Sequence, residues 1–146
     1  MFASESTFVV VILNKFKNME LIKLKKEDIQ ESLPPKIFKA KWLTPTAKTL
    51  LATLIFNYNN SNKSKEDGFL VGSFVQILNA MGWYNNGYYI AKLNNAIAKL
   101  EEYNLLRVVR GNKWCKGEKR KASEYHINWD VINVFKEPQN SIDNNE

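Results

Sequence analysis

The apolar residues of this chain change their spacing at Asn104, and this change limits the folds open to it. Upstream, four apolar residues recur at spacings of three, four and three: Ile90, Leu93, Ile97 and Leu100. Such spacing places them on one stripe of a helix, which we predict from about residue 87 to 103. Downstream, the period falls to two over 106–109 and 125–128, as in the two strands of a hairpin. We therefore expect an α+β fold.

Two further helices are predicted upstream from their terminal signals. The first, roughly 45 to 59, begins at Thr44-Pro45, since Thr can cap a free amide and Pro suits the first helical position. The second follows Ser73, another capping residue, and stops at Gly82. Between them, residues 59–68 are turn-forming types throughout, so we predict an exposed loop. Residues 129–135 close the domain as a short helix or strand.

The length of 146 residues fits one domain with additions at its ends. We expect an N-terminal strand and lysine-rich arm over 1–35, the folded domain over 36–135 and a disordered acidic tail over 136–146. Within the arm, Leu33-Pro34-Pro35 halts any helix that precedes it.

The apolar run Phe8–Leu13 is too short to span a membrane and lacks the flanks of a signal peptide. Its β-branched residues predict a strand, which either joins the sheet of its own chain or pairs with a second copy to form a homodimer. Met19 is an alternative start of the protein. With Cys115 as the only cysteine, no disulfide can form within the chain, so a reducing, cytoplasmic setting is expected.

Positive charge is concentrated in one segment of the chain. The whole protein has a net charge of +6 and a pI near 9.3. Residues 107–121 contain seven basic residues against Glu118 alone, a net +6 that equals the charge of the whole protein. The seven are Arg107, Arg110, Lys113, Lys116, Lys119, Arg120 and Lys121. A nucleic acid is the favoured partner, and a solvated loop that keeps the protein soluble is the alternative.

Two stretches resemble the helix-turn-helix domains of phage and plasmid replication initiators: residues 43–51 (LTPTAKTLL) and 96–106 (AIAKLEEYNLL). Leu33-Pro34-Pro35-Lys36 looks like the leucine-proline-lysine lead-in of plasmid initiators. The resemblance covers about 33–130 and implies a winged helix-turn-helix, in which three helices precede a basic β-hairpin wing. The chain departs from the family in its longer segment after Gly82 and in Asn104, which replaces a glycine but tolerates the left-handed conformation.

The outer face of the third helix is the expected reading surface. It carries Tyr88, Lys92, Asn95 and Lys99, whereas Glu101 and Glu102 lie at the carboxyl end, away from the expected docking end. Asn can pair with adenine edges and Lys with guanine edges or phosphates, although an ordinary solvated helix face is the alternative. The basic residues of the wing are expected to contact phosphates or a minor groove. They are Arg110, Lys113, Lys116, Lys119, Arg120 and Lys121.

We therefore expect double-stranded DNA binding in replication initiation or transcriptional regulation of a plasmid, phage or mobile element. A protein-interaction module is one alternative. Another is RNA or single-stranded DNA binding through Trp83, Tyr84, Tyr88 and Tyr89, although such a cluster is more often core. His126 and Cys115 lack partners at ligand or catalytic spacing. We expect no enzyme activity, metal, cofactor, small-molecule substrate or membrane partner.

Overall fold

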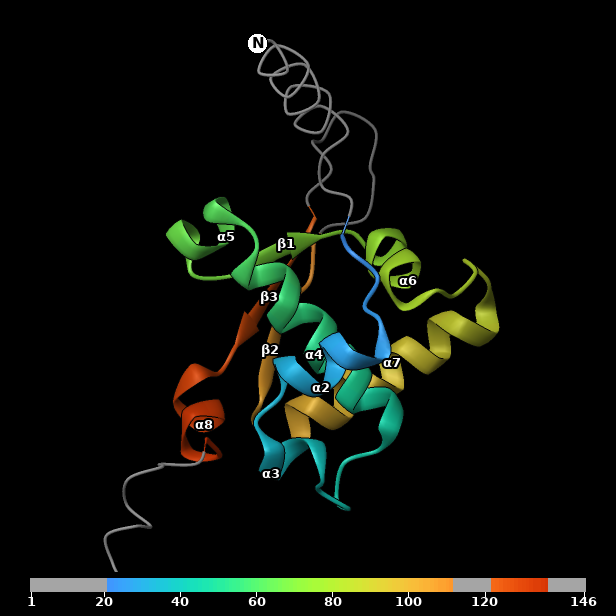
Figure 1. The fold of residues 1–146 in the computed structure, drawn as a ribbon. Helices are drawn as coiled ribbons and strands as arrows, with labels where there is room; N and C mark the ends of the chain where they lie inside the picture. The colour runs from blue at the N-terminus through green and yellow to red at the C-terminus, as the bar shows by residue number, and fades with distance from the viewer. Residues whose placement is uncertain (1–20, 112–121, 137–146) are drawn as a thin grey trace, which may run out of the picture.

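The protein combines seven helices with one three-stranded antiparallel sheet in the part of the chain that the structure, a computed structural model, describes (Figure 1). That part comprises residues 21–111 and 122–136. The expected α+β class is confirmed. The apolar run Phe8–Leu13 and the acidic tail from residue 137 lie outside the described residues. Within those residues, no helix is both long and apolar enough to cross a membrane.

Among the described residues, four helices precede the first strand, two lie between the first and second strands, and one follows the third strand. The helices are α2 (Lys26–Ser32), α3 (Pro35–Phe38), α4 (Pro45–Asn59), α5 (Asn62–Asp67), α6 (Phe74–Met81), α7 (Gly87–Glu102) and α8 (Trp129–Val134). The strands are β1 (Leu70–Gly72), β2 (Leu106–Val109) and β3 (Ser123–Ile127). The three helices predicted from periodicity and caps, α4, α6 and α7, are confirmed, and so is the hairpin of β2 and β3.

Local hydrogen bonds explain where these helices begin and end. The Thr44 hydroxyl accepts a hydrogen bond from the Ala47 amide at 3.2 Å, at the start of α4. At α6, Ser73 and Gln76 form a reciprocal capping box, with distances of 3.1 and 2.7 Å. Gly82 ends α6 with φ 79°, and Asn104 adopts φ 61° after α7, as predicted from its tolerance of this conformation.

The prediction of an exposed loop over residues 59–68 is wrong, because this segment contains α5. The Ser61 hydroxyl accepts a hydrogen bond from the Ser64 amide at 3.0 Å and so caps the helix. Gly68 ends it with φ 88°. The residue types that form turns also cap helices, so a cap at each end supports one short helix between them.

The lysine-rich segment before residue 36 is part of the packed domain from residue 21 onward rather than an arm. It forms α2, which ends just before Leu33-Pro34, and both Leu24 and Leu33 are buried in the core. The buried side chain of Asn57 binds the backbone of this segment at Ile22. Asn57 accepts a hydrogen bond from the Ile22 amide at 2.7 Å and donates one to the Ile22 carbonyl at 3.1 Å.

Helix α4 lies at the centre of the core, and α7 packs against it with the predicted apolar stripe. Leu93, Ile97 and Leu100 are fully buried, whereas Ile90 is only partly buried. The inner face of β3 adds Tyr125 and Ile127 to the same core. Helices and sheet therefore share one hydrophobic core.

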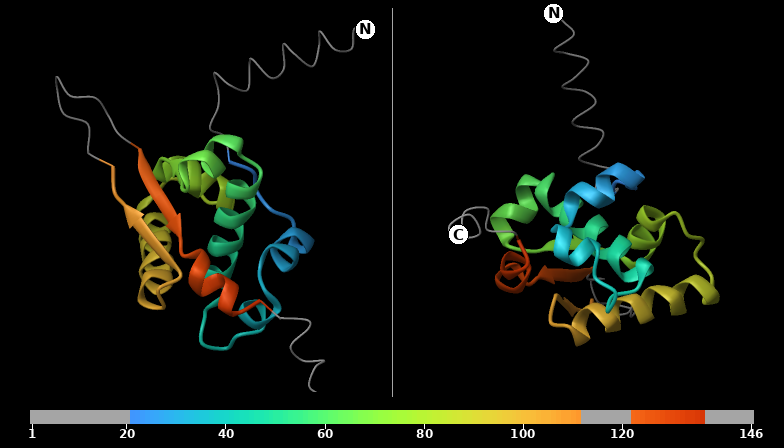
Figure 2. Two further views of the ribbon diagram at one scale, coloured as in Figure 1. Left: turned by 90° about the vertical axis from the view of Figure 1, so that its left-hand side faces the viewer. Right: turned by 60° about the horizontal axis from the view of Figure 1, so that its bottom comes forward.

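The sheet order is β1-β3-β2, so the two strands of the hairpin are joined by a third from far upstream. Tyr125 in the central strand pairs with Val108 on one side and with Leu70 on the other. Figure 2 shows β2 and β3 side by side, with α7 running next to β2. The predicted reading helix and the predicted wing are consequently neighbours in space.

Candidate nucleic-acid interface

Helix α7 presents four of the predicted site residues on its outer side. Asn86 caps the helix by accepting a hydrogen bond from the Tyr89 amide at 2.9 Å. The four are Tyr88, Lys92, Asn95 and Lys99. Tyr88 is exposed, and Lys99 is half-buried. Since the opposite side of α7 is buried against α4, this face is the one that α7 can offer to a ligand.

One of the two lysines on the outer face of α7 has an acidic partner, which the sequence did not indicate. The Lys99 ammonium lies 3.3 Å from a carboxylate oxygen of Glu102, one helical turn further on. Glu102 thus neutralises a residue of the expected site, although the sequence placed it away from the docking end. Lys92 has no acidic neighbour of this kind among the described residues, and its ammonium lies 5.0 Å from the Trp83 ring.

The aromatic cluster before and at the start of α7 is only partly core. Trp83 is half-buried, but Tyr84 is 76% exposed and Tyr88 is 68% exposed. The expectation of a core cluster is therefore wrong for Tyr84 and Tyr88. The turn between α6 and α7 carries Tyr84 outside the core, and Tyr88 lies on the outer side of the first turn of α7.

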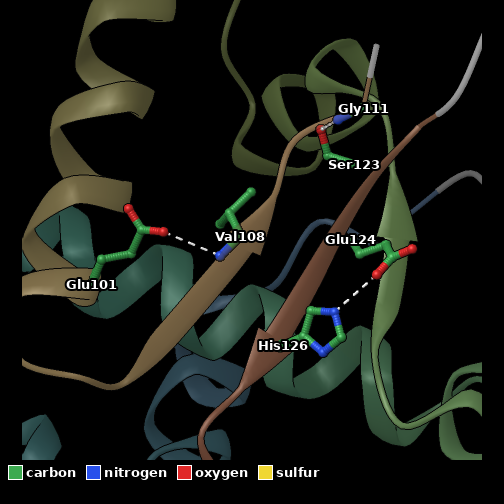
Figure 3. Close-up of polar contacts among 6 residues, drawn as sticks. All are labelled: Glu101, Val108, Gly111, Ser123, Glu124 and His126. Carbon is green, nitrogen blue, oxygen red and sulfur yellow. Dashed lines mark hydrogen bonds and ion pairs between the residues drawn. The ribbon is translucent and has the colours of Figure 1, made fainter.

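The described end of the hairpin places one predicted wing residue beside α6. The Arg110 guanidinium lies 5.4 Å from the Phe74 ring at the start of that helix. The next residue, Gly111, donates its amide hydrogen to the Ser123 hydroxyl at 3.1 Å, which closes the described part of the hairpin (Figure 3). The other predicted wing residues lie outside the described residues. These are Lys113, Lys116, Lys119, Arg120 and Lys121.

Glu101 joins α7 to the edge of the sheet. Its carboxylate accepts a hydrogen bond from the backbone amide of Val108 in β2 at 3.1 Å (Figure 3). This bond satisfies a donor that an edge strand leaves unpaired. The sequence alone did not reveal this role, because the turn at Asn104 must first bring β2 back along α7.

The outer face of the sheet carries the only histidine of the sequence. His126 Nε2 lies 3.0 Å from a carboxylate oxygen of Glu124 (Figure 3), and the Phe69 ring lies 4.6 Å from the imidazole. In the described ranges, no three side chains of the metal-binding types gather into a group. This face therefore offers a histidine–carboxylate contact beside an aromatic ring.

Tyr125 contributes an unusual group to the inner face of the sheet. Burial raises the pKa of its hydroxyl to about 12, against the opposing effects of the nearby Arg110 charge and the Ser123 hydroxyl. Within the described part of the chain, the hydroxyl has no partner in hydrogen-bond geometry. The group therefore stays neutral at physiological pH, and the nearby Ser123 hydroxyl does not meet hydrogen-bond geometry with it.

No family model, curated protein or solved structure matches the chain. The candidate interface consists of the outer face of α7, the exposed rings at its start and the basic segment that includes Arg110.

Proposed function

We propose that this protein is a winged-helix protein that binds double-stranded DNA. In this proposal α4, α6 and α7 are the three helices, β2 and β3 form the wing, and β1 is the third strand. The order of these elements and the sheet order β1-β3-β2 support the fold. The resemblance of residues 43–51 and 96–106 to phage and plasmid replication initiators supports it independently.

One observation carries the functional proposal: α7 lies next to β2, and most of the basic segment 107–121 follows β2 in the sequence. The hairpin segment 107–121 accounts for a charge equal to that of the whole protein. From Gly68 to Leu100 the sequence contains no Asp or Glu, so the amino-terminal three turns of α7 add no acid to this surface. A helix of this kind fits the major groove while adjacent cations bind phosphates.

The division of labour follows from the chemistry of each side chain. Asn95, near the middle of α7, can form two hydrogen bonds to an adenine edge. Arg110 and the basic residues that follow it supply attraction to phosphates, which depends on salt and little on sequence. Because Lys99 is paired with Glu102, the amino-terminal half of α7 is the half that docks.

A role in replication initiation on a plasmid, phage or related element follows from the resemblance, and transcriptional regulation is the alternative with the same DNA-binding step. The homodimer through Phe8–Leu13 also remains a proposal. Two copies would bind two half-sites of the DNA, because a single winged-helix domain buries only a limited surface against it.

The test replaces three cations of the wing. The variant with Lys119→Ala, Arg120→Ala and Lys121→Ala should bind random-sequence duplexes more weakly. Its salt dependence should flatten by about 0.9 log units for each phosphate that the variant no longer binds. Mobility shift across a salt series measures both effects.

The matched control removes the same charge elsewhere, at lysines of α2, the α3 end and α5: Lys26→Ala, Lys39→Ala and Lys65→Ala. This control should keep the salt slope of the original protein. An equal change in both triple variants would assign the attraction to net charge alone and would contradict a wing that contacts DNA.

A further inference from the structure

Two tyrosine side chains at the α6–α7 junction are largely exposed to solvent and do not pack in the core. Tyr84 is 76% exposed and Tyr88 is 68% exposed, and they are four residues apart. Both rings contact Tyr89, at centroid distances of 6.3 and 4.9 Å, so they belong to one cluster. Together they present aromatic surface to solvent at one end of the reading helix.

The exposed rings are supported from beneath. Tyr89 packs against the core and stacks on Trp83 at a centroid distance of 5.5 Å with an interplanar angle of 24°. Tyr84 and Tyr88 meet Tyr89 edge-on, at 64° and 81°. Asn86 caps α7 within the same segment, which fixes its backbone. Each of the two rings therefore has a partner within the cluster, and any order that these contacts give it before a ligand arrives reduces the entropy lost on binding.

A cation accompanies the rings. The Lys92 ammonium lies 5.9 Å from the Tyr88 ring and 5.0 Å from the Trp83 ring. Since the sequence has no Asp or Glu from Gly68 to Leu100, this segment holds no acid of its own to neutralise the lysine. Exposed aromatic faces beside a cation are the two components that single-stranded nucleic acids need, because bases stack and phosphates pair with the charge.

We infer that Tyr84, Tyr88 and Lys92 form a surface that binds the unpaired bases of a single-stranded nucleic acid. Every base has an aromatic face, and in a duplex these faces are covered by the neighbouring pairs, so only an unpaired strand can use both rings fully. This inference goes beyond the proposed function. It stands on the rings rather than on the wing, and it does not require duplex binding.

The experiment titrates the full chain into fluorescein-labelled oligothymidylate and oligouridylate of about 12 nucleotides, followed by anisotropy. The double variant Tyr84→Ala, Tyr88→Ala should bind either probe at least about fivefold more weakly, since the bases lose both of the rings on which they stack. The double variant Tyr84→Phe, Tyr88→Phe should keep the affinity, because it keeps both rings.

The matched control is Val134→Ala, which removes an apolar side chain with 75% exposure from α8 and should leave binding unchanged. Circular dichroism should show all variants folded, since the substituted residues are exposed. Loss of affinity for either probe in the alanine variant alone supports the inference.

The inference is overturned if the original protein binds neither probe, or if the original protein and the alanine variant bind equally well. Self-association that disappears only in the alanine variant, without an effect on the probes, would also overturn it and assign the rings to a protein partner. Duplex binding with an unchanged salt slope in the wing variant would contradict the proposed function alone. The two proposals can therefore fail separately.

Discussion

Tyr125 combines a well-packed ring with a hydroxyl that has no hydrogen-bond partner among the described residues. Its ring fills the inner face of the central strand, where it is fully buried. Its hydroxyl, in contrast, finds no hydrogen-bond partner among the residues described. A buried polar group without a partner lowers stability, because folding removes its bonds to water and returns nothing. Burial of the Tyr125 ring thus stabilises the fold, whereas burial of its hydroxyl lowers the stability.

We expect Tyr125→Phe to raise the free energy of unfolding by about 1 kcal/mol, because it removes the unsatisfied hydroxyl and keeps the ring. Urea denaturation measures the change. Tyr58→Phe serves as control, since its ring is only half-buried against Trp129, and it should change stability little. A less stable Tyr125→Phe variant would show that the hydroxyl has a partner.

The same hydroxyl predicts a loss of stability at alkaline pH. Its pKa is raised from 10.0 to about 12 in the folded protein. Between these values the unfolded chain has lost the proton that the folded protein retains, so stability falls as the pH rises. In Tyr125→Phe, the decline between pH 10 and pH 12 should be shallower. Identical alkaline declines in both proteins would contradict a buried, neutral Tyr125.

At the scale of elements, α7 and β2 are joined by more than apolar packing. Glu101 on the helix binds the Val108 amide on the edge strand at 3.1 Å. The bond crosses the turn at Asn104, whose left-handed backbone reverses the chain. It also occupies an edge donor that could otherwise pair with another strand. Glu101 therefore adds a polar contact between the hairpin and the proposed reading helix.

Glu101→Ala should lower the free energy of unfolding by about 1 kcal/mol, since the Val108 amide loses a charged acceptor. Glu101→Gln should recover part of the loss, because its side-chain oxygen still accepts. The matched control is Glu102→Ala on the same turn, whose partner is the surface residue Lys99, and we expect a change below about 0.5 kcal/mol. Thermal melting of the three variants distinguishes them. Similar losses from both alanine variants would argue against a specific role of Glu101.

Across the whole molecule, residues far apart in sequence close the core. The segment around Ile22 is bound to α4 through Asn57, 35 residues away. A third hydrogen bond, from Asn57 to the Thr53 carbonyl at 2.8 Å, orients the same side chain. Similarly, Leu70 in β1 pairs with Tyr125 in β3. The segment around Ile22 thus binds a helix that follows it, and β1 pairs with a strand that lies far downstream.

Asn57→Ala should lower the free energy of unfolding by about 2 kcal/mol or more, because the amide and carbonyl of Ile22 both lose their partner. Urea denaturation with a matched control tests this. Asn60→Ala also removes a side-chain hydrogen bond to the backbone, at 2.8 Å to the Phe56 carbonyl, but at an exposed site. It should have a small effect. Equal losses would show that burial of the Ile22 contact is not what stabilises the segment.

The sequence by itself determined the elements whose signals lie within a few neighbouring residues. Thr44-Pro45, the Ser73 cap, Gly82 and the periods on either side of Asn104 predicted α4, α6, α7 and the hairpin correctly. These signals suffice because helix caps and apolar stripes are satisfied by nearby backbone and by one buried face.

Only the tertiary structure decided which surfaces meet. It paired β1 with β3, bound Ile22 to Asn57 and left the Tyr84 and Tyr88 rings outside the core. It also gave Glu101 its bond to β2 and Lys99 its partner Glu102. Burial and long-range pairing depend on how the elements pack together, and no window of neighbouring residues contains that information.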